Sequence, residues 1–459
     1  MPDMWKRVHI MGMGGTGLSA IARVLLEQGV EVSGCDRQMG ALLEEVGRQG
    51  ARVYVGHDPD HVTDAEALLV TSAVPLDHPE VEAARERGVP VFRRRDFLPH
   101  LLAGRQVIGV AGTHGKTTTT GMLVHMLRSE GIPVGYIVGS PLPRWGNARA
   151  GENGHFIIEA DEYDYMFWGL SPQVAVITNV EWDHVDLFPT EEAYRDAFVG
   201  YAQRAERVVA CAEDPGAMEV AQRSGRPVVT YGVRADADWR AEVAGLDSRG
   251  RIRFQPVRAG TRVGPVLTLE VPGYHNVLNA LAALAALDAA GFSPESLSTH
   301  LRTYRGADRR FQHVGQVGGV VIIDDYAHHP TEVRATLAAL RQLYPRARVW
   351  AVFQPHTYTR TRALLDRWTE AFADADHVAV MDIYAARERD TLGLSGEGVA
   401  QALAHPRGHY TGDVASTVAF LAEHVRPGDV VITLGAGTSV HVARNLLQVL
   451  ESKGAGGRG

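Results

Sequence analysis

The chain has 459 residues, 45% of them hydrophobic, and a formal net charge of −8 at pH 7. This length predicts two to four domains, and the charge excludes non-specific attraction to nucleic acid as a working mode. No run approaches the roughly 20 apolar residues of a membrane span, the N-terminus has no signal-peptide pattern, and two cysteines are too few for a disulfide framework. We therefore expect a soluble cytoplasmic protein with no nucleic-acid or membrane partner.

Short β-branched runs alternate with amphipathic stretches along the chain, which is typical of an α/β fold with mainly parallel sheets and crossover helices. A strand at 7–11, a helix at 16–28 and a strand at 31–35 open a first, Rossmann-like domain over 1–103. We expect the domain to bind a nucleotide.

A second domain is expected over 104–312. Its strand at 106–111 leads through a glycine-rich loop into a helix at 116–130. The rest consists of two buried strands, a charged antiparallel excursion and a long apolar helix, at 155–159, 174–179, 236–270 and 275–290. A third, Rossmann-like domain over 313–459 follows, with strands and a helix at 320–324, 331–343, 348–353 and 430–434. The tail 453–459 is expected to be disordered.

The first glycine motif, Gly12-Met-Gly-Gly-Thr-Gly17, follows a strand and opens a helix. Asp36 ends the next strand, as in dinucleotide-binding fingerprints, in which backbone amides at a helix N-terminus approach a pyrophosphate. A tight turn that only packs the helix against the strand remains the alternative. Any diphosphate would satisfy the motif.

The second glycine motif, Gly112-Thr-His-Gly-Lys-Thr117, predicts a phosphate-binding loop. Its backbone N–H groups would cradle phosphate oxygens, Lys116 would supply positive charge, and the Thr117 hydroxyl would reach Mg²⁺. Val110 stands where the common P-loop has its first glycine, so a shortened variant fits better than a kinase or GTPase loop.

Acidic and polar residues follow the next two buried strands, where α/β sheets place their ligands. Alternation predicts that Glu159 and Asp161 point the same way, and Glu159 is preferred as a metal ligand. After the second strand, His184 is a candidate ligand for a divalent ion, with Asp183 or Asp186 orienting its other nitrogen.

Further along the chain, Asn276 and Asn279 share one helix face by their i,i+3 spacing. Asn276 is also a candidate helix cap. The adjacent His328 and His329 should point apart, and we predict no zinc site there.

Seven motifs in order resemble the Mur ligase family over essentially the whole chain. They are Gly112-Thr-His-Gly-Lys-Thr-Thr118, Glu159-Ala-Asp-Glu162, Thr178-Asn179 with Asp183-His-Val-Asp186, His275-Asn-Val-Leu-Asn279, Arg309-Arg-Phe-Gln312, Asp324-Asp-Tyr-Ala-His-His-Pro330 and Phe353-Gln-Pro-His-Thr-Tyr-Thr-Arg360.

The resemblance implies an N-terminal UDP-sugar-binding domain, a central ATPase domain and a C-terminal domain that brings in the amino acid. The implied substrates are UDP-N-acetylmuramate, ATP and L-alanine, joined through an acyl phosphate in bacterial cell-wall synthesis. It implies two Mg²⁺ ions, replaceable by Mn²⁺. A monomer or homodimer is expected.

The resemblance also assigns residues to each function. The catalytic residues would be Lys116, Glu159, His184, Arg310 and Asp325, and the metal ligands Thr117, Glu159 and His184. ATP would meet Gly112, Thr113, His114, Gly115, Lys116, Thr117, Thr118, Asn276 and Asn279. The UDP-sugar would meet Gly14, Gly15, Thr16, Gly17, Asp36 and Ser72, and the amino acid Tyr326, His328, His356 and Arg360.

Three alternatives stay open. A recycling ligase of the same family would add a preformed murein tripeptide to the same sugar nucleotide. An NAD-dependent oxidoreductase would explain the first glycine motif and nothing after Ala111. A non-catalytic UDP-sugar-binding regulator would bind without turnover.

Overall fold

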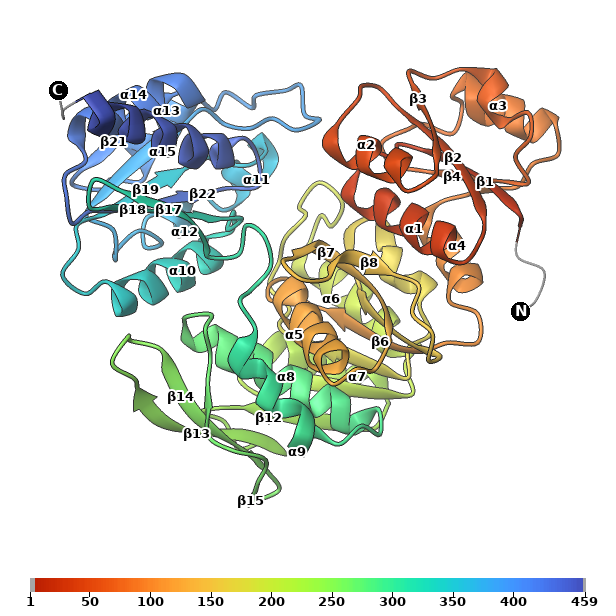
Figure 1. The fold of residues 1–459 in the computed structure, drawn as a ribbon, viewed down its shortest axis with the longest axis horizontal. Coiled ribbons are helices and arrows are strands. Elements are labelled where there is room, and N and C mark those ends of the chain that lie inside the picture. Colours follow the sequence, from red (N-terminus) through yellow and green to blue (C-terminus); the bar gives the residue numbers. More distant parts are fainter. Residues whose placement is uncertain (1–4, 457–459) are drawn as a thin grey trace.

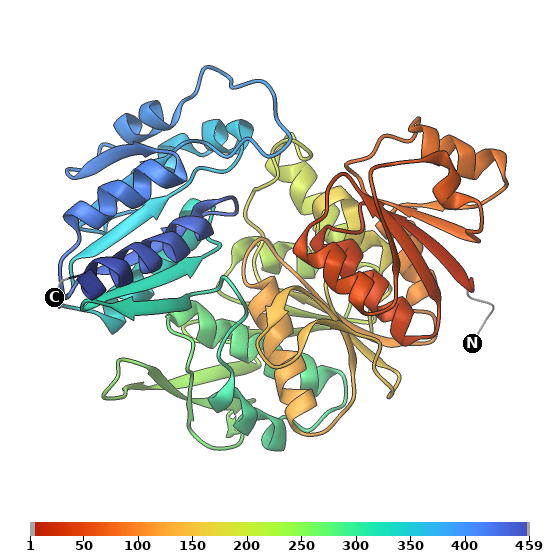
Figure 2. The same ribbon diagram turned by 45° about the horizontal axis from the view of Figure 1, so that its top comes forward.

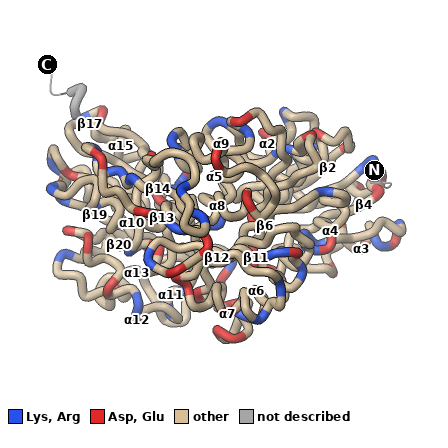
Figure 3. The backbone as a smooth tube through the Cα atoms, turned by 90° about the horizontal axis from the view of Figure 1, so that it is seen from below, with Lys and Arg blue, Asp and Glu red and all other residues tan. Residues whose placement is uncertain are grey.

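The computed structural model describes residues 5–456 and places them in three α/β domains, each built around its own sheet (Figure 1). In the turned view of Figure 2 the central domain lies between the other two. Lysine and arginine are interspersed with aspartate and glutamate along the tube in the view of Figure 3.

The N-terminal domain is a five-stranded parallel sheet in the order β3-β2-β1-β4-β5. Its strands are β1 (Arg7–Met11), β2 (Glu31–Asp36), β3 (Arg52–Val55), β4 (Ala67–Val70) and β5 (Val91–Phe92). Its helices are α1 (Thr16–Glu27), α2 (Ala41–Arg48), η1 (Pro59–Val62), α3 (Pro79–Glu86) and α4 (Arg94–Leu101). The chain reverses its order between β1 and β4, so the first glycine motif lies at a topological switch point.

The central domain has an eleven-stranded sheet in the order β15-β14-β13-β12-β11-β10-β6-β9-β7-β8, with β16 on β14. Its strands are β6 (Gln106–Ala111), β7 (Gly135–Leu142), β8 (Gly146–Arg149), β9 (His155–Glu159), β10 (Val174–Ile177), β11 (Arg207–Cys211), β12 (Val228–Gly232), β13 (Trp239–Leu246), β14 (Ile252–Arg258), β15 (Thr261–Arg262) and β16 (Leu267–Thr268). Its helices are α5 (Lys116–Ser129), η2 (Tyr163–Gly169), α6 (Glu191–Ala202), α7 (Pro215–Ser224), α8 (Tyr274–Ala289), α9 (Pro294–Leu297) and η3 (Ser298–Thr303). The expected excursion is the antiparallel pair β13 and β14, which extends the sheet beyond β12.

The C-terminal domain has a six-stranded sheet in the order β17-β18-β22-β19-β20-β21, in which only the pairing of β17 with β18 is antiparallel. Its strands are β17 (Gln312–Val317), β18 (Val320–Asp325), β19 (Val349–Phe353), β20 (His377–Met381), β21 (Gly408–Gly412) and β22 (Val430–Leu434). Its helices are α10 (Pro330–Leu343), α11 (Tyr358–Ala363), α12 (Leu365–Trp368), α13 (Gly396–Ala402), α14 (Val414–His424) and α15 (Ser439–Gly456). Ile322 and Ile323 belong to different apolar clusters, so both faces of this sheet are covered.

Most predicted strands are confirmed within one residue. The clearest cases, such as β6, β19 and β22, are apolar runs that the fold buries along nearly their whole length. Two expectations were wrong. Strand β10 ends at Ile177, which leaves Thr178 and Asn179 in the loop beside the second glycine motif. Helix α15 continues to Gly456, so a disordered tail from 453 is incorrect over 453–456, and 457–459 lie outside the described residues. Within residues 5–456, no helix has the length and apolar character needed to cross a membrane.

Candidate active site

The second glycine motif forms a tight loop between β6 and α5. Gly112 and Gly115 have φ angles of +143° and +81°, a region that favours glycine. A Cβ at Gly112 would lie 1.9 Å from the Thr178 hydroxyl, and one at Gly115 would lie 2.5 Å from the Asn279 side-chain oxygen. Since Gly115 also precedes the first turn of α5, the helix begins without a capping side chain. The N–H groups of Thr113 and His114 donate to Asn179, so the amides that this loop can offer to a phosphate are those that follow, at the start of α5.

Lys116 and Thr117 turn toward acidic side chains at the end of β9. The Lys116 ammonium donates to the Thr113 carbonyl at 3.1 Å and lies 3.0 Å from the Glu162 carboxylate. The Thr117 hydroxyl donates to Glu159 at 3.1 Å. One cation, one hydroxyl and two carboxylates thus meet at the loop.

The acidic residues after β9 have different partners, whereas the alternation of side chains predicted that Glu159 and Asp161 point the same way. Asp161 forms a 3.2 Å ion pair with Arg94 of the N-terminal domain, whereas Glu159 accepts the Thr117 hydroxyl. Glu162, to which the sequence analysis gave no role, is the buried partner of Lys116 and lies 3.4 Å from His184. Burial raises the pKa of Glu159. Burial also opposes charge on Glu162, but Lys116 and His184 lower its pKa to about 2.

His184 follows β10 and has a φ angle of +49°, an uncommon conformation for a non-glycine residue. Its Nε2 faces Glu162. Asp183 and Asp186 were the two carboxylates expected to orient the His184 ring, and both have other partners: Asp183 accepts two hydrogen bonds from Arg360, at 2.7 and 3.2 Å, and Asp186 accepts the Tyr163 hydroxyl at 3.4 Å. Burial opposes protonation, but Asp183 and Glu162 raise the pKa of His184.

A cavity of about 230 Å³ opens beside the glycine loop and is lined by both the central and the C-terminal domains. Asn276 and Asn279 of α8 line it and share one helix face as predicted, with the Asn279 amide donating to the Asn276 side chain at 3.0 Å. Asn276 was also a candidate helix cap, but its side-chain amide donates to the Pro272 carbonyl and does not cap the start of α8. Thr118 also lines this cavity.

His114 joins the two walls of the cavity. Its Nε2 lies 3.1 Å from Glu181 of the central domain, and its Nδ1 lies 3.2 Å from Glu332 of the C-terminal domain. Burial opposes protonation, but these two carboxylates raise the pKa of His114 to about 9. The Thr331 hydroxyl adds a second link by donating to Glu181 at 2.9 Å. The C-terminal domain is thus docked on the glycine loop.

The segment between these domains carries Arg310 to the loop. Arg310 lies 3.5 Å from the Thr117 hydroxyl. Asp325 accepts the backbone N–H groups of Phe311 and Ala327 at 2.7 and 2.8 Å, so it fixes the segment behind Arg310. Burial raises the pKa of Asp325 to about 6.

The residues expected around the amino acid lie at the edge of this site. The His328 and His356 ring centroids are 5.7 Å apart, and Arg360 donates to the His356 ring at 3.0 Å. Tyr326 stands 5.3 Å from the His328 ring centroid. Burial lowers the pKa of His328 to about 4 and that of His356 to about 3. Both imidazoles are therefore neutral at pH 7.

His328 and His329 do point apart, as predicted. His328 faces His356, whereas the His329 ring centroid lies 4.8 Å from that of His114. His329 also comes within metal-ligand spacing of His114 and Glu181. Its Nδ1, however, accepts the Thr331 N–H and caps α10.

The first glycine motif surrounds the start of α1. The Gly14 N–H donates to Asp36 at 2.9 Å, and Gly15 and Thr16 are exposed at the helix N-terminus. Ser72 is exposed in the turn after β4, the neighbour of β1. A Cβ at Gly17 would lie 2.9 Å from the Arg94 guanidinium, a cation that the sequence analysis missed because it lies some eighty positions further along the chain.

A glycine loop with an adjacent lysine, two nearby carboxylates and a cavity lined by a separate α/β domain define an α/β protein with a nucleotide-phosphate site. The sequence matches three family descriptions: "Mur ligase family, catalytic domain" over residues 7–106, "Mur ligase middle domain" over 110–287 and "Mur ligase, glutamate ligase domain" over 309–437. The chain belongs to the Mur ligase family.

Individual relatives agree over nearly their full length. A UDP-N-acetylmuramate--L-alanine ligase of Roseiflexus castenholzii is 42% identical over 468 residues, covering 96% of this chain and 97% of the relative. The crystal structure of a UDP-N-acetylmuramate-alanine ligase of Thermotoga maritima matches with a TM-score of 0.81 and 28% identity, covering 98% of this chain and 100% of that one. A murein peptide ligase of Psychrobacter arcticus shares the fold, with a TM-score of 0.72 at 24% identity, covering 97% and 98% of the two chains.

Proposed function

We propose that this chain joins L-alanine to the lactyl carboxylate of UDP-N-acetylmuramate, converting ATP to ADP and phosphate, in the synthesis of peptidoglycan precursors. The relatives from Roseiflexus castenholzii and Thermotoga maritima are both named as ligases of UDP-N-acetylmuramate and alanine. The observation that supports it most directly is the meeting of Lys116, Thr117 and Glu159 with Arg310, a residue from the segment leading into the C-terminal domain.

The reaction has two steps. The substrate carboxylate attacks the γ-phosphorus of ATP, which forms an acyl phosphate and releases ADP. The amine of alanine then attacks the acyl carbon, and phosphate leaves. Lys116 and Arg310 neutralise charge on the phosphoryl group, so the protein acts by positioning and electrostatics and needs no nucleophile of its own.

The donor set beside the loop fits Mg²⁺. The Thr117 hydroxyl and the Glu159 carboxylate are hard oxygen ligands only 3.1 Å apart, and Glu162 contacts both Lys116 of the loop and the His184 imidazole. We assign one Mg²⁺ to Thr117 with the ATP phosphates, and a second to Glu159 and His184. Such ions supply charge neutralisation at the transferring phosphoryl group.

The remaining predicted residues divide by domain. Thr16 and Gly17 offer the first amides of α1 to the UDP pyrophosphate, and Gly14 and Gly15, whose N–H groups donate to Asp36 and Gly12, form the turn beside it. Asn276 and Asn279 face the adenine end of ATP in the cavity. Tyr326, His328, His356 and Arg360 surround the incoming alanine. Arg360 would contact the alanine while its guanidinium remains hydrogen-bonded to Asp183.

A substrate panel tests the assignment. Phosphate release is measured with ATP and UDP-N-acetylmuramate against L-alanine, L-serine, glycine and the tripeptide L-alanyl-γ-D-glutamyl-meso-diaminopimelate. We expect turnover with L-alanine well above all others. Preference for the tripeptide would identify a recycling ligase instead, and sugar-nucleotide binding without phosphate release would identify a non-catalytic binding protein.

A further inference from the structure

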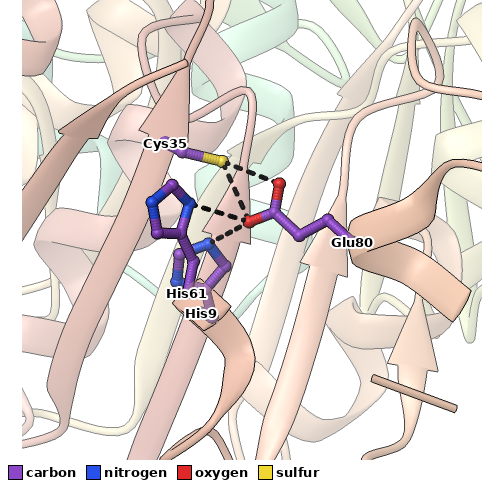
Figure 4. A group of neighbouring side chains, drawn as sticks. All are labelled: His9, Cys35, His61 and Glu80. Carbon is purple, nitrogen blue, oxygen red and sulfur yellow. Dashed lines mark hydrogen bonds and ion pairs between the residues drawn. The ribbon is translucent and has the colours of Figure 1, made fainter. Parts of the chain in front are cut away.

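Four metal-ligating side chains converge inside the N-terminal domain, away from the ATP cavity (Figure 4). They are His9 of β1, Cys35 of β2, His61 of η1 and Glu80 in the first turn of α3. His9, Cys35 and Glu80 are fully buried. The proposed ligation chemistry uses none of these four.

Their ligand atoms all lie within 4.8 Å of one another. Glu80 Oε1 lies 3.0 Å from His9 Nε2, 3.2 Å from His61 Nδ1 and 3.4 Å from Cys35 Sγ. Ligands at Zn–N, Zn–O and Zn–S distances of 2.0–2.3 Å occupy the corners of a tetrahedron whose edges are about 3.3–3.8 Å. The three contacts of Glu80 Oε1 are therefore within a few tenths of an ångström of such an edge, and no pair of ligand atoms is more than 4.8 Å apart, so small side-chain shifts would let the cluster enclose an ion.

Neighbouring residues hold the ligands in orientation. Ser33 lies 2.8 Å from Nδ1 of His9, which leaves Nε2 to face Glu80. The Tyr54 ring stacks on His61 with centroids 4.1 Å apart. His57 lies 3.2 Å from the other oxygen of Glu80. Hydrogen-bonded outer partners of this kind are characteristic of zinc ligands.

The charges and donor types also match one ion. A thiolate and a carboxylate together carry two negative charges, which a divalent cation neutralises in a site where an unpaired charge would be costly. Two imidazoles, one thiolate and one carboxylate favour zinc over magnesium or calcium, which prefer oxygen alone. The alternative is a metal-free network in which the imidazoles and the thiol donate to Glu80.

We propose that His9, Cys35, His61 and Glu80 form a structural zinc site. Binding displaces the proton of the Cys35 thiol to solvent and forms the Zn–S bond. Four protein ligands from four elements leave no open position, which is the pattern of structural and not catalytic zinc.

The site would brace the first glycine motif. The Cys35 carbonyl accepts the N–H groups of Gly12 and Met13 at 2.8 and 3.1 Å. Fixing Cys35 to η1 and α3 therefore holds the strand that shapes this turn.

Cobalt substitution of the full-length chain tests the proposal. The protein is stripped with chelator, dialysed against Co²⁺ and compared with the variants Cys35→Ser and Cys211→Ser, the latter removing the other buried cysteine, in β11. We expect the wild type and Cys211→Ser to show the intense visible bands of tetrahedral Co²⁺ and a thiolate-to-cobalt charge-transfer band. Cys35→Ser should lose the charge-transfer band.

Zinc competition and thermal unfolding complete the experiment. Zn²⁺ should bleach the cobalt bands at one equivalent per chain, and chelator should lower the Tm of the wild type but not of His61→Ala. A folded wild type that shows no thiolate band with Co²⁺ overturns the proposal, as does a band that persists in Cys35→Ser. Since the first outcome uses the unmodified chain, misfolding of a variant does not obscure the answer.

Discussion

Lys116 occupies the glycine loop with its ammonium held by Glu162, so ATP must take over contacts that the protein now makes with itself. We predict that Lys116→Ala lowers kcat by at least about 100-fold, the scale expected when a group that stabilises transition-state charge is removed. UDP-N-acetylmuramate binding, measured by calorimetry, should be unchanged because the first glycine motif lies on a separate sheet. Lys6→Ala, an exposed lysine of the N-terminal domain, is the control. Loss of sugar-nucleotide binding in folded Lys116→Ala would refute the division between domains.

His184 is assigned to a metal ion, and its replacement should therefore change how the activity depends on Mg²⁺ concentration. We predict that His184→Ala raises the Mg²⁺ concentration needed for half-maximal phosphate release at least about tenfold. A loss of metal affinity of this size is typical when a residue that supports a metal site is removed. His313→Ala, an exposed histidine on β17, should behave as the wild type. Full activity of His184→Ala at unchanged Mg²⁺ would leave His184 with a structural role only.

For single residues, the sequence predicted the glycine loop, the position of Glu159 at the end of its strand and the shared face of Asn276 and Asn279, because each follows from local spacing. It did not predict that Glu162 holds Lys116 or that Asp183 pairs with Arg360. Those contacts depend on how a loop turns after its strand ends and on how a distant domain docks. Neither is encoded in a period of two or 3.6 residues.

At the level of the helices, the start of α5 packs closely against α8 at Gly115, where Asn279 of α8 lies nearby. We predict that Gly115→Ala lowers stability by about 1–3 kcal/mol and weakens ATP binding, because the new methyl group would meet Asn279. Gly131, just after α5, has nearly the same φ angle, +85°, but open space around it. Gly131→Ala therefore separates backbone strain from collision, and urea unfolding with ATP titration of both variants provides the comparison. Equal losses in both would show that only the left-handed backbone matters.

At the scale of the whole molecule, the buried pair of Arg360 and Asp183 joins the C-terminal domain to the central one. Removing one partner of such a pair costs about 3–5 kcal/mol, since a buried charge is left alone. We predict that Arg360→Ala shifts the C-terminal domain away from the cavity, with a larger radius of gyration in X-ray scattering and a large loss of kcat.

The matched control is Arg367→Ala. Arg367 also reaches across to the central domain, 3.2 Å from Glu181, but its side chain is half exposed, and exposed pairs contribute little. Its scattering profile should match that of the wild type. If Arg360→Ala scatters identically too, the docking of this domain does not depend on the buried pair.

Asn279 touches Thr119 and the Asn276 side chain while its oxygen fills the space above Gly115. A single amide therefore lies against both the face assigned to the base and the loop assigned to the phosphates. Sequence change at Asn279 is therefore constrained twice, because any substitution that altered the choice of nucleotide base would also disturb the geometry of the phosphate loop. Changes in nucleotide preference should consequently evolve through the other residues of the cavity wall, with Asn279 and Gly115 retained or replaced only together.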